Sequence, residues 1–219
     1  MGKKLVNKIT IVGCGPGSKK HLTGLALQRI KNADSLIGSK RLLDLFADTD
    51  TDKYTVNRNY KLLIMRIISL SKRKKVVVLV SGDPGFFSYS KLIIDKVGIE
   101  NCEIIPGISS VQLAFASIGK TWNDACFVSL HGRKDEFPML VKKVKEYKKV
   151  AVLTDDSNNL KLISKGLLSE GIRGRTVYVC ENLSLKMERI RKFKLSSLQR
   201  VQVRGLNVII ILEENSSSS

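Results

Sequence analysis

The 219-residue sequence predicts an α/β protein of two lobes, each built on its own sheet. Apolar, β-branched runs alternate with helix-like segments over the first 120 residues, which is typical of a mostly parallel, doubly wound sheet. Consecutive strand-like segments late in the chain favour a mixed second sheet. The length and a hydrophobic fraction of 43% are sufficient for one or two domains with buried cores.

The first lobe is expected over residues 1–120. Its clearest strand is residues 76–80, a Val-Val-Val-Leu-Val run suited to burial on both faces of a parallel sheet. Shorter apolar runs predict the other strands, at residues 8–12, 34–38 and 102–105. Apolar residues at helical spacing predict helices at residues 22–30, 39–46 with Ser39 as N-cap, 60–70, 86–97 and 108–118. Residues 48–57 are polar and are predicted to form a turn.

The second lobe is expected over residues 121–214, after a polar connection at 120–124. Strands are predicted at residues 125–129, 150–153, 176–180, 186–193 and 207–212. Helices are predicted at residues 138–147 and 158–168, the second closed by turns at Gly171 and Gly174. Residues 215–219 are rich in Ser and are predicted to be a disordered tail.

The charge is strongly basic. Lys and Arg number 38 against 20 Asp and Glu, a formal net charge of +18, which favours a polyanionic partner. Nucleic acid, an anionic membrane and a small substrate rich in carboxylates or phosphates all fit this charge. No apolar run approaches the ~20 residues of a bilayer span, and no apolar signal-peptide region follows the amino terminus. We therefore expect a cytoplasmic location and no membrane partner.

Cysteine and histidine spacing predicts neither a disulfide framework nor a metal site. The four cysteines lie far apart in sequence, at Cys14, Cys102, Cys126 and Cys180. The histidines are His21 and His131, with no pair at metal-ligand spacing. No nucleophile motif is present, so no covalent catalysis is expected and no catalytic residue is assigned.

Loops of small and polar residues follow several strands, where open α/β sheets bind their ligands. In the first lobe these are residues 13–17, 81–85 and 106–110; in the second they are 129–133, 153–156 and 180–183. Loop 13–17 departs from a dinucleotide-binding loop because Pro16 interrupts it and Ser18 stands at the third glycine position. A tight structural turn explains this loop equally well.

Loop 81–85 follows the most apolar strand. Pro84 favours an extended Asp83, whose carboxylate can bond backbone N–H groups or reach a ligand hydroxyl. In loop 106–110, Ser109 or Ser110 can cap the following helix.

Together these loops resemble the tetrapyrrole methylases, a family of S-adenosylmethionine-dependent enzymes. The resemblance rests on residues 12–17 with Leu22 and Thr23, then on residues 81–85 and 106–110, in the family's order. It covers nearly the whole chain. It implies two α/β lobes with the active site in the cleft between them, S-adenosylmethionine as cofactor and a homodimer.

Residues 38–43, 129–133 and 181–190 are similar to the cobalamin-pathway subgroup of precorrin-6Y methylases, also called cobalt-precorrin-7 carbon-5 methyltransferases. This resemblance implies methylation of ring carbon 5 of a precorrin or cobalt-precorrin. In some relatives the domain is fused to a second methyltransferase that also decarboxylates the substrate. This chain is too short for that fusion, so we expect a separate partner enzyme.

The resemblance also implies roles for individual residues. The cofactor-binding residues it implies are Pro16, Gly82, Asp83, Phe86, Ser110, Val111, His131, Thr154, Glu181 and Asn182. Gly15 and Gly17 should border the substrate, and Arg41 and Arg133 are candidates for binding its carboxylates. Asp83 is expected to position the cofactor rather than to act as a general base.

The mechanism expected from this resemblance is direct displacement, in which a ring carbon attacks the sulfonium methyl group and the protein aligns and desolvates the reactants. Two alternatives remain: a ribosomal RNA ribose methylase of the same fold, and a non-enzymatic RNA-binding module. Aromatic residues are only 6% and do not interleave with the basic runs, which disfavours nucleic acid. The sequence leaves open whether the substrate carries cobalt.

Overall fold

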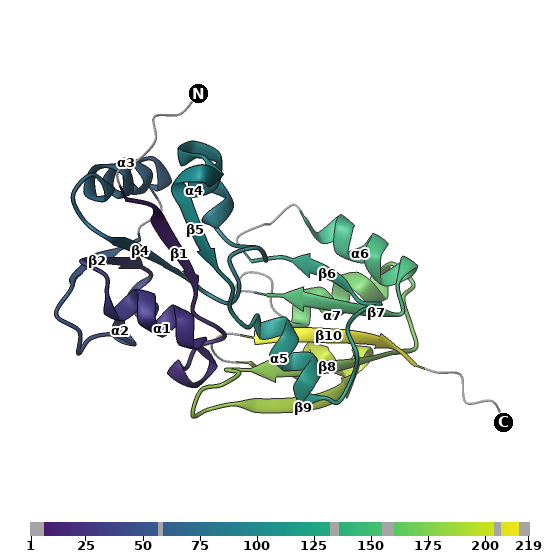
Figure 1. The fold of residues 1–219 in the computed structure, drawn as a ribbon. Coiled ribbons are helices and arrows are strands. Elements are labelled where there is room, and N and C mark those ends of the chain that lie inside the picture. Colours follow the sequence, from purple (N-terminus) through teal and green to yellow (C-terminus); the bar gives the residue numbers. More distant parts are fainter. Residues whose placement is uncertain (1–6, 57–58, 132–135, 155–159, 204–206, 215–219) are drawn as a thin grey trace. The chain divides into compact units, whose positions relative to one another are not determined.

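The computed structural model describes residues 7–56, 59–131, 136–154, 160–203 and 207–214 (Figure 1). The chain divides into two compact units, Met1–Ser109 and Ser110–Ser219. The sequence favoured a boundary after residue 120. In the structure, helix α5 (Ser110–Ser117) packs against strand β10 (Asn207–Glu213), so α5 is part of the second unit.

The first unit contains a parallel sheet with the strand order β3-β2-β4-β1-β5. Its strands are β1 (Ile9–Gly13), β2 (Ser35–Gly38), β3 (Asp52–Thr55), β4 (Val76–Val80) and β5 (Cys102–Ile105). Strand β1 lies between β4 and β5, with Gly13 opposite Val80 and Val12 opposite Ile105. The loops that follow these three strands therefore leave the sheet side by side at one edge.

Helices cover both faces of this sheet. They are α1 (Gly24–Lys31), α2 (Lys40–Asp44), α3 (Tyr60–Ser71) and α4 (Ser90–Val97), with short 3-10 turns at Lys19–His21 and Ile99–Asn101. Helices α1 and α2 lie on one face, and α3 and α4 lie on the other (Figure 1). The period of two along β1 explains this, because Val12 packs toward α1 and α2 while Ile9 and Ile11 pack toward α3 and α4.

Two local expectations for this unit were wrong. Strand β3 occupies residues 52–55, where the polar sequence indicated a turn, and it pairs with β2 at the edge of the sheet. Helix α4 begins at Ser90 rather than at residue 86, because Phe87 has a φ of 49°, which a right-handed helix does not accommodate. Ser39 stands at the N-cap of α2 as expected, although its side chain makes no capping hydrogen bond.

The second unit contains a mixed sheet with the strand order β6-β7-β10-β8-β9, which confirms the expectation from the late strand-rich sequence. Its remaining strands are β6 (Cys126–Ser129), β7 (Lys149–Leu153), β8 (Arg175–Glu181) and β9 (Arg189–Lys194). Strands β6 and β7 are parallel, and β10 is antiparallel to both β7 and β8. As a result, β6, β7 and β8 all end at the same edge.

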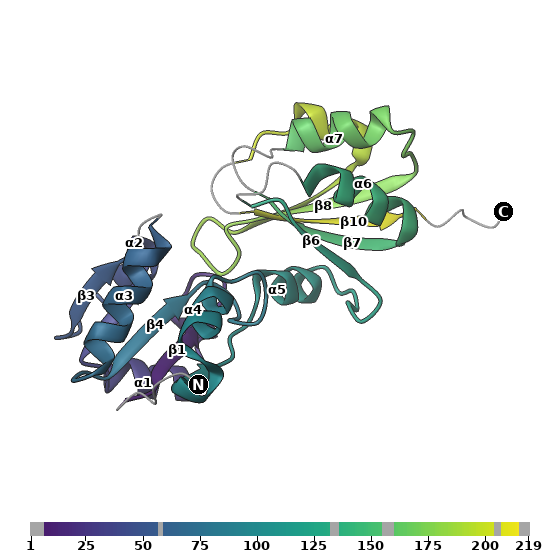
Figure 2. The same cartoon turned by 90° about the horizontal axis from the view of Figure 1, so that it is seen from above.

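Helices α6 (Phe137–Glu146) and α7 (Leu160–Ser169) lie on one face of the second sheet, together with a 3-10 segment, η4 (Leu195–Arg200). Helix α5 lies on the opposite face (Figure 2). A hydrophobic cluster on that face joins α6 and α7 to the sheet through side chains such as Leu140, Ile163 and Ile209. Among the described residues, no helix has the length and apolar character needed to cross a membrane.

Candidate functional site

Three glycine-bearing loops meet at the edge of the first sheet, after β1, β4 and β5. The first two are joined as a short antiparallel bridge. The Gly15 N–H donates to the Gly82 carbonyl oxygen at 3.2 Å, and the Gly82 N–H donates to the Gly15 carbonyl oxygen at 2.9 Å. The loops are thus hydrogen-bonded beyond the ends of their strands.

The third loop packs on the other two so closely that side chains are excluded. A Cβ atom added to Gly107 would lie 2.4 Å from the Gly82 carbonyl oxygen and 2.6 Å from the Gly13 carbonyl oxygen. A Cβ atom on Gly13 would lie 2.6 Å from the Gly107 nitrogen. Glycine is required at these positions by close approach of backbone to backbone.

The Asp83 carboxylate connects two of these loops. Its Oδ1 accepts a hydrogen bond from the Gly85 N–H at 2.7 Å, and its Oδ2 accepts one from the Gly107 N–H at 3.0 Å. Of the two roles that the sequence left open for this carboxylate, the structure shows the bonding to backbone N–H groups. Asp83 therefore holds the loop after β4 against the loop after β5.

The other expected residues of this unit lie along the same loops. Pro16 and Gly17 are buried, and Gly15 has a φ of 69°. Phe86 is half-buried and meets the exposed Phe87 edge to face, with ring centroids 4.7 Å apart. Positive φ values at Gly15, Gly82 and Phe87 show that these loops are held in conformations that most residues avoid.

Arg41, from the first turn of α2, reaches the start of the loop after β4. Its Nη2 donates a hydrogen bond to the hydroxyl of the exposed Ser81. Burial lowers the pKa of the Arg41 guanidinium, and burial raises the pKa of the neighbouring Cys14 thiol to about 12. The second arginine candidate, Arg133, lies outside the described residues, as does Gly132.

In the second unit, strand register brings the expected polar residues to one edge of the sheet. Thr154 follows β7 and is buried, and its hydroxyl hydrogen-bonds the Asn207 side chain. Asn207 in turn pairs with Glu181 at the end of β8. His131 is exposed and follows Leu130, whose N–H donates to the Leu153 carbonyl oxygen at 2.9 Å.

Glu181 is buried in an ion pair. Its Oε2 accepts hydrogen bonds from Arg191 Nε at 3.1 Å and from Nη2 at 2.8 Å. The same Nη2 donates to the Gln202 carbonyl oxygen at 2.9 Å. Asn182 follows in the left-handed region with a φ of 50°. The Glu181–Arg191 pair therefore links β8 to β9, and Arg191 extends the link to residue 202, a contact that the sequence did not indicate.

Ser110 and Val111 open helix α5 of the second unit. Ser110 is half-buried and Val111 is buried. The structure thus places the expected residues in two groups. One group, from Pro16 to Phe86, lies in the first unit, and the other, from Ser110 to Asn182, lies in the second.

Asn207 and Arg191 were missed by the sequence reasoning. That reasoning searched only the residues after strands, whereas Asn207 begins β10, which is antiparallel to β7 and β8. The amino end of an antiparallel strand lies at the same edge as the carboxyl ends of its neighbours. The polar residue before the run 208–212 was the signal that could have identified it.

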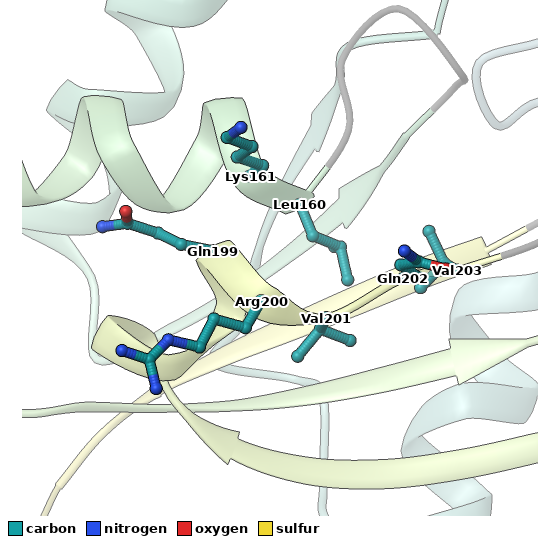
Figure 3. Close-up of a pocket in the computed structure, with 7 residues that line it drawn as sticks. All are labelled: Leu160, Lys161, Gln199, Arg200, Val201, Gln202 and Val203. Carbon is teal, nitrogen blue, oxygen red and sulfur yellow. The ribbon is translucent and has the colours of Figure 1, made fainter.

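A separate pocket of about 470 Å³ lies in the second unit (Figure 3). It is lined by Leu160, Lys161, Gln199, Arg200, Val201, Gln202 and Val203. None of the residues expected in the cofactor or substrate site lines it, so this pocket is not the candidate site.

Comparison with known proteins adds independent information. The model of the tetrapyrrole (corrin/porphyrin) methylases matches residues 8–199. The chain is 37% identical over 198 residues to a probable cobalt-precorrin-7 C(5)-methyltransferase of Methanocaldococcus jannaschii, covering 88% of this chain and 90% of the relative. It is 34% identical over 206 residues to the cobalt-precorrin-7 C(5)-methyltransferase of Salmonella typhimurium, covering 94% and 99%.

Among solved structures, the chain is similar to the precorrin-6Y methylase of Archaeoglobus fulgidus. The TM-score is 0.72 at 26% identity, covering 95% of this chain and 98% of that one. The match extends over both units.

Proposed function

The chain belongs to the tetrapyrrole (corrin/porphyrin) methylases, and we propose that it methylates carbon 5 of cobalt-precorrin-7. It is an S-adenosylmethionine-dependent methyltransferase of cobalamin biosynthesis. The observation that carries the choice of substrate is the near full-length similarity to two relatives of that name, from an archaeon and a bacterium.

The residues in the first unit fit S-adenosylmethionine. Close packing of Gly13, Gly82 and Gly107 makes one firm backbone surface, and Phe86 adds a half-buried aromatic ring beside it. When bound, this cofactor supplies an electrophilic methyl group on a sulfonium sulfur, which the substrate carbon takes up as the carbon–sulfur bond breaks. We assign Pro16, Gly82, Asp83 and Phe86 to its binding.

In the second unit, the cofactor-binding residues that we propose are Ser110, Val111, His131, Thr154, Glu181 and Asn182. Two of these, Thr154 and Glu181, are supported by their place at one edge of the second sheet, where both are adjacent to Asn207. The ion pair with Arg191 keeps the Glu181 carboxylate in place.

The protein's part in the reaction is to hold and align the reactants, since the substrate carbon is itself the nucleophile. Asp83 is not proposed as a base, because each of its carboxylate oxygens accepts a backbone N–H. The Cys14 thiol is buried with a pKa of about 12, so it stays protonated at neutral pH and is not proposed as a nucleophile. Gly15 and Gly17 are proposed to border the substrate.

We further propose that the protein acts in the cytoplasm as a homodimer. A separate decarboxylating methyltransferase would complete the chemistry that some members of the subgroup carry on one chain. Size-exclusion chromatography with light scattering tests the dimer.

The decisive assay incubates the protein with methyl-labelled S-adenosylmethionine and either cobalt-precorrin-7 or its cobalt-free counterpart, followed by mass spectrometry. We expect one added methyl group on the cobalt-containing ring. A parallel incubation with ribosomal RNA tests the alternative of the same fold. Label in RNA, with none in any tetrapyrrole, would contradict the proposed function.

A further inference from the structure

Arg41 carries an unsatisfied donor in an otherwise well-bonded region. Its Nη2 is bonded to the Ser81 hydroxyl, whereas its Nη1 is buried and has no hydrogen-bond partner among the described residues. Buried polar groups in folded proteins are almost always paired, so a buried guanidinium nitrogen without a partner requires an explanation. A bound anion is one explanation that the chemistry of the group favours.

The other partly buried arginines of the described chain have strong acceptors. Arg29 reaches both carboxylate oxygens of Glu103, the shortest at 2.7 Å. Arg191 is paired with Glu181 at 2.8 Å. Arg175 donates to the Val144 carbonyl oxygen at 2.7 Å. Arg175 also lies 3.5 Å from a Glu213 carboxylate oxygen. Arg41 differs from all three because its observed partner is an uncharged hydroxyl and no carboxylate of the described residues is paired with it.

No neighbour within the described residues supplies the missing negative charge. Cys14 lies beside the guanidinium, but its thiol is protonated at neutral pH. On α2 itself, the nearest carboxylate in sequence, Asp44, is paired with Lys40 at 3.1 Å. Taking a guanidinium out of water costs free energy unless an anion compensates it, so the free protein keeps Arg41 at an energetic disadvantage.

We propose that Arg41, aimed by Ser81, is the receptor for a ligand carboxylate at this edge of the first sheet. The planar guanidinium can meet a carboxylate with two parallel N–H donors, and one of them is already buried and unused. The inference rests on the proposed function and deepens it, because that reaction offers two carboxylate sources. One is an acid side chain of the tetrapyrrole, and the other is the methionyl carboxylate of the cofactor.

Arg41→Met is the main test, because it removes the charge and keeps a long apolar side chain. We expect the melting temperature of the free protein to stay within about 3 °C of wild type or to rise, since an unpaired buried charge is removed. We expect the affinity for the carboxylate ligand to fall roughly 10- to 100-fold. Arg41→Lys keeps the charge without the fork and should show a smaller loss.

Lys40→Gln is the matched control, since it removes a cation from the neighbouring position of the same helix. The Lys40 side chain is 81% exposed and paired with Asp44, so its loss should leave ligand affinity unchanged. Ser81→Ala should weaken binding of the carboxylate ligand less than Arg41→Met does, because it removes only the hydrogen bond that orients the guanidinium.

Two binding measurements identify the source of the carboxylate. A rise in the KM for cobalt-precorrin-7 with unchanged binding of S-adenosylhomocysteine, measured by calorimetry, supports a tetrapyrrole carboxylate. Weaker binding of S-adenosylhomocysteine supports the methionyl carboxylate. If both stay within about twofold of wild type in Arg41→Met, the inference is overturned.

Failure of the Arg41 inference can be distinguished from failure of the proposed function. If the wild type methylates cobalt-precorrin-7 and Arg41→Met does so with the same kinetics and the same S-adenosylhomocysteine affinity, only this inference falls. If the wild type methylates no tetrapyrrole, the proposed function is contradicted. The calorimetric measurement of S-adenosylhomocysteine binding then tests the role of Arg41 by itself. If Arg41→Met does not fold, Arg41 is structural and the inference is overturned, unless a folded Arg41→Lys shows the loss of affinity.

Discussion

Asp83 shows how one side chain can fix the relation between two loops. Its two carboxylate oxygens accept backbone N–H groups from Gly85, in its own loop, and from Gly107, in the loop after β5. Hydrogen bonds to an ionised acceptor are stronger than those between neutral groups. A buried donor that loses its acceptor also destabilises the fold, because its desolvation free energy is no longer compensated. A carboxylate is therefore needed at this position, because each of its two oxygens accepts a different backbone N–H group.

Asp83→Asn should therefore cost stability as well as cofactor affinity. The amide has one acceptor oxygen, so either the Gly85 or the Gly107 N–H would face an NH₂ group. We expect a loss of about 1–3 kcal/mol, seen as a fall of roughly 2–12 °C in melting temperature, and weaker binding of S-adenosylhomocysteine. Differential scanning fluorimetry and calorimetry measure the two effects.

Asp95→Asn provides the matched control for this substitution. Asp95 lies on α4 of the same unit, its side chain is 52% exposed, and its partner is the exposed Lys91 at 2.7 Å. Exposed pairs of this kind contribute about 0–1 kcal/mol, so little change is expected. Equal losses in the two variants would contradict the role given to Asp83.

Individual residues also show where sequence reasoning succeeds and where it stops. Pro84 and the end of a buried strand were enough to predict that the Asp83 carboxylate can bond backbone N–H groups. The contact of Thr154 with Asn207 could not be predicted, because it depends on the register of an antiparallel strand more than fifty residues away. Register is decided by pairing and burial across the sheet, which no local pattern encodes.

The three glycine loops behave as one element because the strands before them are neighbours. With β1 between β4 and β5, the segments at Gly13, Gly82 and Gly107 must pack backbone against backbone. The close approach leaves no volume for a methyl group at the contact.

Gly107→Ala should disrupt this packing. Its Cβ would press on two carbonyl oxygens, and neither is the flexible end of a side chain. We expect a loss of at least about 1–3 kcal/mol in the free energy of unfolding, measured by urea denaturation, and reduced affinity for S-adenosylhomocysteine.

Gly24→Ala is the comparison that separates crowding from the general effect of replacing glycine. A Cβ on Gly24 meets nothing within 4 Å, and Gly24 begins helix α1. Alanine there should be neutral or stabilise the protein by up to about 0.5–1 kcal/mol. A Gly107→Ala protein as stable as this control would show that the loops can separate without cost.

The elements with strong local signals were predicted to within a few residues. The run Val76–Val80 and the strand Cys102–Ile105 lie where the apolar pattern indicated. Strand β3 was missed because Asp-Lys-Tyr-Thr has no apolar alternation. It becomes a strand by pairing with β2 along the sheet edge, where polar side chains are tolerated. Its tertiary partner, rather than its own sequence, determines its structure.

The net charge of +18 is a property of the whole molecule and acts at a distance. Several lysines are paired locally, such as Lys91 with Asp95 and Lys145 with Glu170, but the cationic excess remains. A field of this sign raises the capture rate of a substrate with several carboxylates without changing its geometry once bound. The same field would attract RNA, so charge alone does not distinguish the two.

Salt dependence separates them and tests the role of the charge. The screening length falls from about 30 Å at 0.01 M salt to about 10 Å at 0.1 M, so kcat/KM for cobalt-precorrin-7 should fall severalfold over this range. The kcat should change little, because bound contacts are screened much less than exposed ones. S-adenosylmethionine carries a net positive charge, so its affinity should not weaken in parallel, which makes it the internal control.

A kcat/KM that is independent of salt would show that the surplus charge does not steer this substrate. A steep logarithmic slope for RNA, set by the number of neutralised phosphates, would instead favour RNA as the partner that the charge serves.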